Sequence, residues 1–228
     1  MHGTGEPAGP ARSSAAAWSH ARPLREEITS AAIQGSAAAA SAVGLAYLVE
    51  RPWPLQDAYG IAALAVYGAS MFIAFLVSAL YHGVQRPRIR SILQRIDHCT
   101  IFLLIAGTYT PVALLPLRHH DGVALLAAIW TLAIAGIAMR LTNEPLFQRI
   151  AIPLYLAMGW LGLGWSVPLY QKIGATPILL MLAGAVSYSG GLLFYRWHRR
   201  PFSNSMWHLC VVAGGAWFFV AITRFVPA

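Results

Sequence analysis

Seven apolar runs, each long enough for a membrane-spanning helix, follow one another along the chain with short polar breaks between them. A helical span needs about 20 mostly apolar residues, because the hydrocarbon core of a bilayer is about 30 Å thick. Arginine and proline occur in these breaks, as is typical of the ends of apolar helices. The pattern predicts an all-α integral membrane protein with seven transmembrane helices. The expected spans are residues 28–50, 57–80, 98–117, 122–139, 150–169, 175–195 and 206–223.

Composition supports this class and divides the chain into two parts. Of the 228 residues, 57% are hydrophobic and only 11% are charged, whereas a soluble domain has about 25% charged residues. Residues 1–25 consist largely of Ala, Gly, Pro, Ser and Arg and contain no apolar run. We therefore expect a disordered cytoplasmic tail over 1–25, no cleaved signal peptide, and one membrane domain over 26–228.

The basic residues predict the orientation of the chain. The net charge is +8 with 16 Lys and Arg residues, of which twelve fall on the side of the N-terminus and four on the other side. By the positive-inside rule the N-terminus is cytoplasmic and the C-terminus is outside. The positive charge is thus explained by topology, and we expect no nucleic-acid partner. The two cysteines, Cys99 and Cys210, do not define a disulfide framework.

Four polar residues stand out because they are expected at the same end of their helices. Ser78 and His82 lie at the cytoplasmic end of the second span, Asp97 at the start of the third and His208 near the start of the seventh. Ionisable groups inside or at the edge of a span are costly and usually mark function. Their shared depth predicts a half-buried metal or proton site.

Each of these residues also has a simpler interpretation. A histidine near a span end is often a hydrogen-bonded interfacial side chain, Asp97 can pair with Arg95, and Ser78 can bond its own helix backbone. His98 points about 100° away from Asp97 around the helix, so we expect it to lie outside the site. The simpler interpretations do not explain why the four residues share one depth.

Two motifs make the chain resemble a known family. Ser78-Ala-Leu-Tyr-His82 and the stretch from Asp97 to Pro111 resemble the hemolysin III family, which belongs with the progestin and adipoQ receptors. The resemblance begins at Glu26-Glu27, continues through Trp207-His208 and covers nearly the whole chain after residue 25. It implies seven helices, a cytoplasmic N-terminus and a zinc ion held by three histidines near the cytoplasmic face.

The resemblance also assigns roles to individual residues. It implies that His82 and His208 bind zinc, that Asp97 holds a zinc-bound water, and that Ser78 is the serine of the family motif. The sequence departs from the family where the first histidine of the seventh-span motif falls on Asn204, since an amide oxygen is a poor zinc ligand beside imidazole. In the first span, where bacterial members often carry a histidine, this chain has Gln34. Zinc is the cofactor that the resemblance implies, with Asn204 as a doubtful third ligand. Weak binding through Asn204 and waters, a different third ligand and an empty site all remain open.

Three functions remain open at this point. The first is a zinc-dependent hydrolase of lipid amides or esters in the bacterial plasma (inner) membrane, with a membrane lipid as substrate and Asp97 and Ser78 as catalytic residues. The second is a non-enzymatic membrane sensor or regulator with a degenerate metal site, favoured by Asn204. The third is a pore-forming cytolysin, which is disfavoured because most spans are apolar all round. Retinal binding is excluded because the only lysine, Lys172, is in a loop.

Overall fold

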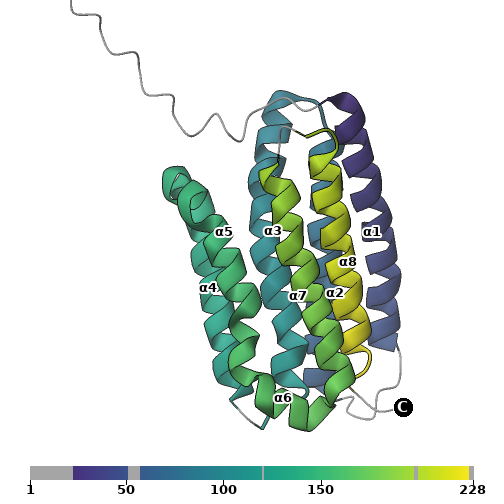
Figure 1. Ribbon diagram of the computed structural model, residues 1–228, viewed down its shortest axis with the longest axis vertical. Helices are drawn as coiled ribbons and strands as arrows, with labels where there is room; N and C mark the ends of the chain where they lie inside the picture. The colour runs from purple at the N-terminus through teal and green to yellow at the C-terminus, as the bar shows by residue number, and fades with distance from the viewer. Residues whose placement is uncertain (1–22, 51–56, 120, 198–199, 226–228) are drawn as a thin grey trace, which may run out of the picture.

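The described residues form a helical bundle in which successive segments of membrane-spanning length run antiparallel (Figure 1). The computed structural model describes residues 23–50, 57–119, 121–197 and 200–225. Within these ranges seven helical segments are long and apolar enough to cross a membrane, which confirms the predicted all-α class. The elements are α1 (Leu24–Glu50), α2 (Ala58–Gly83), α3 (Pro87–Leu114), α4 (Gly122–Thr142), α5 (Glu144–Trp160), the 3-10 helix η2 (Leu161–Trp165), α6 (Ser166–Ile173), α7 (Ala175–Arg196) and α8 (Ser203–Ile222).

Helices that follow one another in sequence pack side by side, and α8 closes back onto α1 (Figure 1). The fifth span is a composite of α5, η2 and α6. Helix α1 begins at Leu24, and the first 22 residues of the expected tail lie outside the described residues. We call the end of the bundle where α1, α3, α5 and α8 begin the arginine-rich end. The described arginines gathered there include Arg86, Arg88, Arg90, Arg95, Arg140, Arg196 and Arg200.

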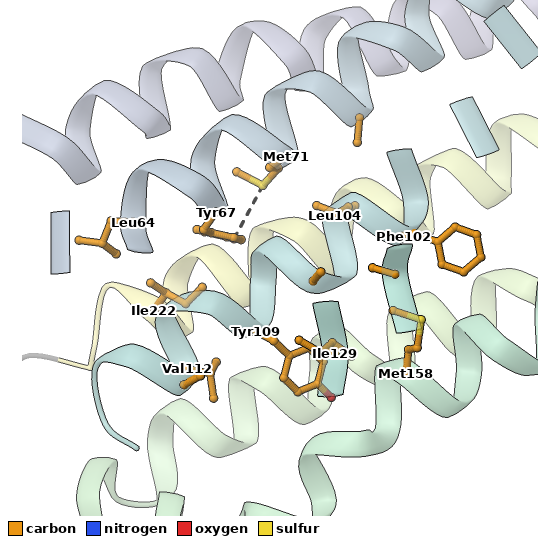
Figure 2. Packing of buried hydrophobic residues seen from close by; sticks show 14 of the residues in the cluster. Leu64, Tyr67, Met71, Phe102, Leu104, Tyr109, Val112, Ile129, Met158 and Ile222 are labelled. Carbon is orange, nitrogen blue, oxygen red and sulfur yellow. Dashed lines mark hydrogen bonds between the residues drawn. The ribbon is translucent and has the colours of Figure 1, made fainter. Parts of the chain in front are cut away.

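Large buried side chains fit against glycines on neighbouring helices. Phe102 of α3 is fully buried, and a Cβ atom added at Gly136 of α4 would lie 2.3 Å from its ring. Likewise, a Cβ atom at Gly107 of α3 would lie 2.0 Å from the hydroxyl of Ser70 on α2. Small residues let spanning helices approach closely, and this packing replaces the hydrophobic effect as the force between helices in lipid. Figure 2 shows the core residues between these helices, with the hydroxyl of Tyr67 directed at the sulfur of Met71.

Helix α3 is longer than the apolar run that predicted it. The run suggested a span over 98–117, whereas α3 begins at Pro87 and ends at Leu114. Proline is well suited to the first turn of a helix, where its missing N–H has no helical partner to lose. The additional turns over 87–97 carry Arg90 and Asp97 along the same helix, and both residues contribute to the site described below.

A break in the fifth span is held by a tyrosine of α3. The hydroxyl of Tyr109 donates to the carbonyl of Gly159 at 2.9 Å and accepts the N–H of Gly162 at 2.8 Å. These are backbone groups at the junction between α5 and η2, where regular helical bonding ends. Tyr109 thus joins the fifth span to α3 at this depth. Toward the arginine-rich end, the α4–α5 hairpin leans away from α3 and α7 (Figure 1).

Candidate functional site: a buried histidine pair on an apolar cavity

Two histidines from helices far apart in sequence meet at the arginine-rich end. His82, in the last turn of α2, is 1% exposed, and His208, in the second turn of α8, is 5% exposed. Their Nε2 atoms lie 2.8 Å apart, with the rings nearly perpendicular. Two unprotonated imidazole nitrogens repel each other at this distance. The pair therefore has to share a proton or another cation.

A buried carboxylate orients His82 from the side opposite His208. Glu27 of α1 is 2% exposed, and its Oε2 lies 2.7 Å from Nδ1 of His82. Its other oxygen accepts from the guanidinium of Arg90 on α3 at 2.6 Å. A carboxylate only accepts hydrogen bonds, so the proton of a neutral His82 resides on Nδ1 and the lone pair of Nε2 faces His208. Metal-binding histidines usually donate their second ring N–H to such a carboxylate, which fixes the tautomer and the orientation of the ring.

Gln34 of α1 contacts Nδ1 of His208, as Glu27 contacts Nδ1 of His82. Its Nε2 lies 2.5 Å from Nδ1 of His208, and its Oε1 is buried without a hydrogen-bond partner. When the amide N–H faces His208, His208 carries its proton on Nε2 and donates it to His82. When the amide oxygen faces His208 instead, Nδ1 carries the proton and both Nε2 lone pairs face each other. Rotation of one amide thus converts the hydrogen-bonded pair into two electron-pair donors for a cation.

Asn204 belongs to a polar cluster that joins the start of α8 to α1. Its backbone N–H donates to Oε1 of Glu26 at 2.9 Å, and its side-chain Nδ2 donates to the hydroxyl of Ser30 at 3.1 Å. The hydroxyl of Ser30 also lies 3.1 Å from that of Ser205. Asn204 is 4% exposed and lies one helical turn before His208 on α8. Both residues line the same cavity. The amide nitrogen of Asn204 is therefore used to hold α8 against α1.

The histidine pair forms one wall of a cavity of about 170 Å³ that runs between α2, α3, α5, α7 and α8. Asp97 lines this cavity too, so the structure brings His82, His208 and Asp97 to one space. Ser78 is buried on α2 one turn before His82, but it is not among the lining residues. His98 lines the cavity, contrary to our expectation that it lies outside the site. The reason is that α5 packs on its side of α3, so the cavity extends around that helix.

Beyond its polar end the cavity is lined by apolar and aromatic side chains. Leu104 and Tyr109 of α3, Tyr155 and Trp160 of α5 and Tyr188 of α7 are among them. A second cavity, of about 80 Å³, shares Tyr109 and Trp160 with the first and continues toward the other end of the bundle. One water molecule takes up about 30 Å³, and a cavity several times larger with apolar walls suits a hydrocarbon chain better than a water cluster.

The residues at the polar end fit a zinc ion incompletely. Two imidazole nitrogens converge, one is backed by a carboxylate, and Gln34 retains a buried oxygen without a partner. Two imidazoles on one tetrahedral zinc ion have nitrogens about 3.3 Å apart, so the pair would have to open by about 0.5 Å and both rings would have to turn until their lone pairs meet at the metal. Within the described residues, however, no group of three His, Cys, Asp or Glu side chains is placed to hold a metal. His82 and His208 are therefore the two strong ligands on offer, where catalytic zinc usually has three.

Within the described residues, seven helical segments of membrane-spanning length surround an apolar cavity with a polar site at one end, and this arrangement defines a polytopic membrane protein. The chain belongs to the hemolysin III family, because the family model described as "Haemolysin-III related" matches residues 24–219. It is 38% identical over 203 residues to "Hemolysin-3" of Bacillus cereus, covering 89% of this chain and 93% of that protein. It is 34% identical over 199 residues to "Hemolysin-3 homolog" of Bacillus subtilis (strain 168), covering 87% and 93%.

A more distant similarity reaches animal proteins. The human "Monocyte to macrophage differentiation factor" is 26% identical over 174 residues, which are 71% of this chain and 69% of that protein. The resemblance read from the motifs around His82 and Asp97 is thereby confirmed at the level of the family.

Proposed function

We propose that the protein is a zinc-dependent hydrolase of lipid amide or ester bonds in the bacterial plasma membrane, with its N-terminus in the cytoplasm. The observation that carries the proposal is the shared cavity. It places Asp97 and the His82–His208 pair at the polar end of a space whose other walls are apolar. A lipid substrate fits this division, with its chain among the aromatic side chains and its polar bond near the histidines.

We assign separate roles in metal binding, base catalysis and water exclusion to residues of this chain. His82 and His208 would hold a zinc ion through Nε2, and Glu27 keeps the proton of His82 on Nδ1. When bound, zinc lowers the pKa of water and polarises a carbonyl oxygen. The carboxylate of Asp97 orients the attacking water and accepts its proton. Ser78 is buried one turn before His82 on α2 and is not on the cavity wall, so we assign it a structural role. The apolar walls exclude bulk water from the reacting bond.

The test is the release of fatty acid from a fluorescent long-chain acyl amide and its matching ester by the zinc-loaded protein in detergent. We expect turnover by the wild type and a loss of about 100-fold or more in Asp97→Asn, because general base catalysis contributes about 10²–10⁴-fold. Asp121→Asn is the matched control, since Asp121 lies exposed before α4 at the opposite end of the bundle. Absence of wild-type turnover on both substrates would contradict the hydrolase proposal.

A second function, a non-enzymatic membrane sensor or regulator, is favoured by one observation. Asn204 stands where the family resemblance implies a histidine, and its side-chain N–H is engaged with Ser30. A site with two strong ligands binds zinc less tightly than one with three. In that case, lipid binding without turnover is the expected behaviour of the cavity.

A further inference from the structure

A third histidine on the cavity wall, His98, is bonded to a buried arginine. Arg140, in the last turn of α4, is only 4% exposed. Its Nε–H donates to Nδ1 of His98 on α3 at 3.2 Å, and its Nη1 pairs with Glu144 at the start of α5. The guanidinium also lies over the ring of Phe147, 4.8 Å from its centre. These contacts with residues of α3 and α5 leave Arg140 little freedom to move.

The contact with Arg140 determines which nitrogen of His98 carries the proton. A guanidinium has five N–H donors and no acceptor, so Nδ1 of His98 must accept. The ring proton of a neutral His98 is then on Nε2. His82 has the reverse arrangement, because its Nδ1 faces the carboxylate of Glu27. The two histidines are therefore opposite tautomers: the Nε2 lone pair of His82 faces His208, whereas Nε2 of His98 carries the N–H.

His98 is also held in place through its backbone and shares the polar end of the cavity with Asp97. The hydroxyl of Tyr155 on α5 donates to the carbonyl of His98 at 3.0 Å. The imidazole lies 5.5 Å from the ring of Phe147, and both residues line the cavity. A guanidinium behind Nδ1 draws electron density from the imidazole and strengthens the Nε2–H as a donor. An N–H donor at the polar end of an apolar cavity is suited to an oxygen acceptor.

We propose that His98 is a ligand-binding residue, which Arg140 holds as the Nε2–H tautomer so that it donates a hydrogen bond to the acyl carbonyl oxygen of a lipid in the cavity. This inference rests on the proposed function only in taking the cavity's ligand to be an acyl lipid, and it does not depend on zinc or on turnover. Arg140 is a positioning residue that acts through His98.

The test compares two pyrene probes of equal chain length, pyrenyl-dodecanoic acid methyl ester and pyrenyl-dodecane. Binding to the purified protein in detergent is followed by energy transfer from tryptophan, since Trp160 and Trp207 line the cavity. A neutral hydrogen bond corresponds to about 3- to 10-fold in affinity, so the wild type should bind the ester tighter by that factor. His98→Gln, which keeps a side-chain N–H, should retain this preference. His98→Met should bind both probes equally.

The outcomes distinguish the role proposed for His98 from the proposal that the cavity binds a lipid. Saturable binding of both probes with equal affinity to the wild type, or an ester preference that survives in His98→Met, overturns the role of His98 and leaves the lipid cavity standing. No saturable binding of either probe to the wild type overturns the lipid cavity and the role of His98 together.

A second measurement applies to the unaltered protein and so does not depend on whether the variants fold. In ¹⁵N-histidine-labelled protein, long-range ¹H–¹⁵N correlations distinguish the two neutral tautomers. We expect the Nε2–H form for His98, and a shift to a mixture of tautomers in Arg140→Met. A wild-type His98 protonated on Nδ1 alone would overturn the proposal.

Discussion

Replacing Glu27 by leucine is expected to destabilise the protein by about 3–5 kcal/mol, the usual cost of removing one partner from a buried ionic pair. Glu27 is 2% exposed and joins three helices, because its two oxygens bind His82 of α2 and Arg90 of α3 from its place on α1. Without the carboxylate, Arg90 loses its partner and Nδ1 of His82 loses its acceptor. For a chain of this length the loss corresponds to a drop of roughly 10 °C in the thermal unfolding midpoint, measurable in detergent.

A matched control lies on the same helix. Glu50 ends α1 and is exposed, so Glu50→Leu should change the free energy of unfolding by no more than about 0.5 kcal/mol. Equal effects of Glu27→Leu and Glu50→Leu would show that the Glu27 contacts contribute nothing to stability. The double variant Glu27→Leu with Arg90→Met should recover part of the loss, because it also removes the charge of the partly exposed Arg90, which Glu27→Leu alone leaves without its partner.

Replacing Asn204 by histidine is expected to raise the affinity for zinc by about 100-fold. Asn204 and His208 are one helical turn apart on α8, and both line the cavity. A histidine at 204 therefore adds a third imidazole on the side of the existing pair and completes the usual number of protein ligands. Changes in groups that only support a ligand already alter affinity by about 10- to 100-fold, so a direct ligand should have at least this effect.

Competition with a zinc chelator measures this change. Asn143→His provides the control, because Asn143 precedes α5 at the same end of the bundle but binds the backbone N–H of Leu146 and does not line the cavity. We expect the control to keep the wild-type affinity. An Asn204→His variant with unchanged affinity would mean that position 204 does not face the metal. The variant also loses the bond to Ser30, so its stability should fall by about 1 kcal/mol.

The seven spans could be predicted from the sequence because a bilayer requires long apolar runs regardless of how the helices pack. The apolar run over 98–117 underestimated the length of α3. Apolar residues mark only the part of a helix that lies in the hydrocarbon layer, whereas α3 already begins at Pro87. The histidines at 82 and 208 could be found for the same reason: polar groups are rare in such a chain, and the alternating direction of the spans fixes the end at which each lies.

The remaining site residues depend on which helices are neighbours, which no single run of sequence reveals. Glu27 sits at the start of its span, where a carboxylate is ordinarily solvated. It is buried because α1 packs against α2 and α8 and because the side chain of Arg90 reaches it from α3. Gln34 stood out only as a departure from the family and proves to contact His208. The rotation of about 100° between Asp97 and His98 correctly separates them on an isolated helix. It could not show that the cavity extends around α3 to include both.

We propose the His82–His208 pair as a cation site, and the metal content of the protein tests this proposal most directly. The protein would be purified in detergent, loaded with zinc, dialysed and assayed for metal per chain. We predict one zinc ion in the wild type, none in His82→Ala or His208→Ala, and one in His119→Ala, whose histidine is exposed in the connection between α3 and α4. A wild type without zinc, or zinc retained in both pair variants, would contradict the account.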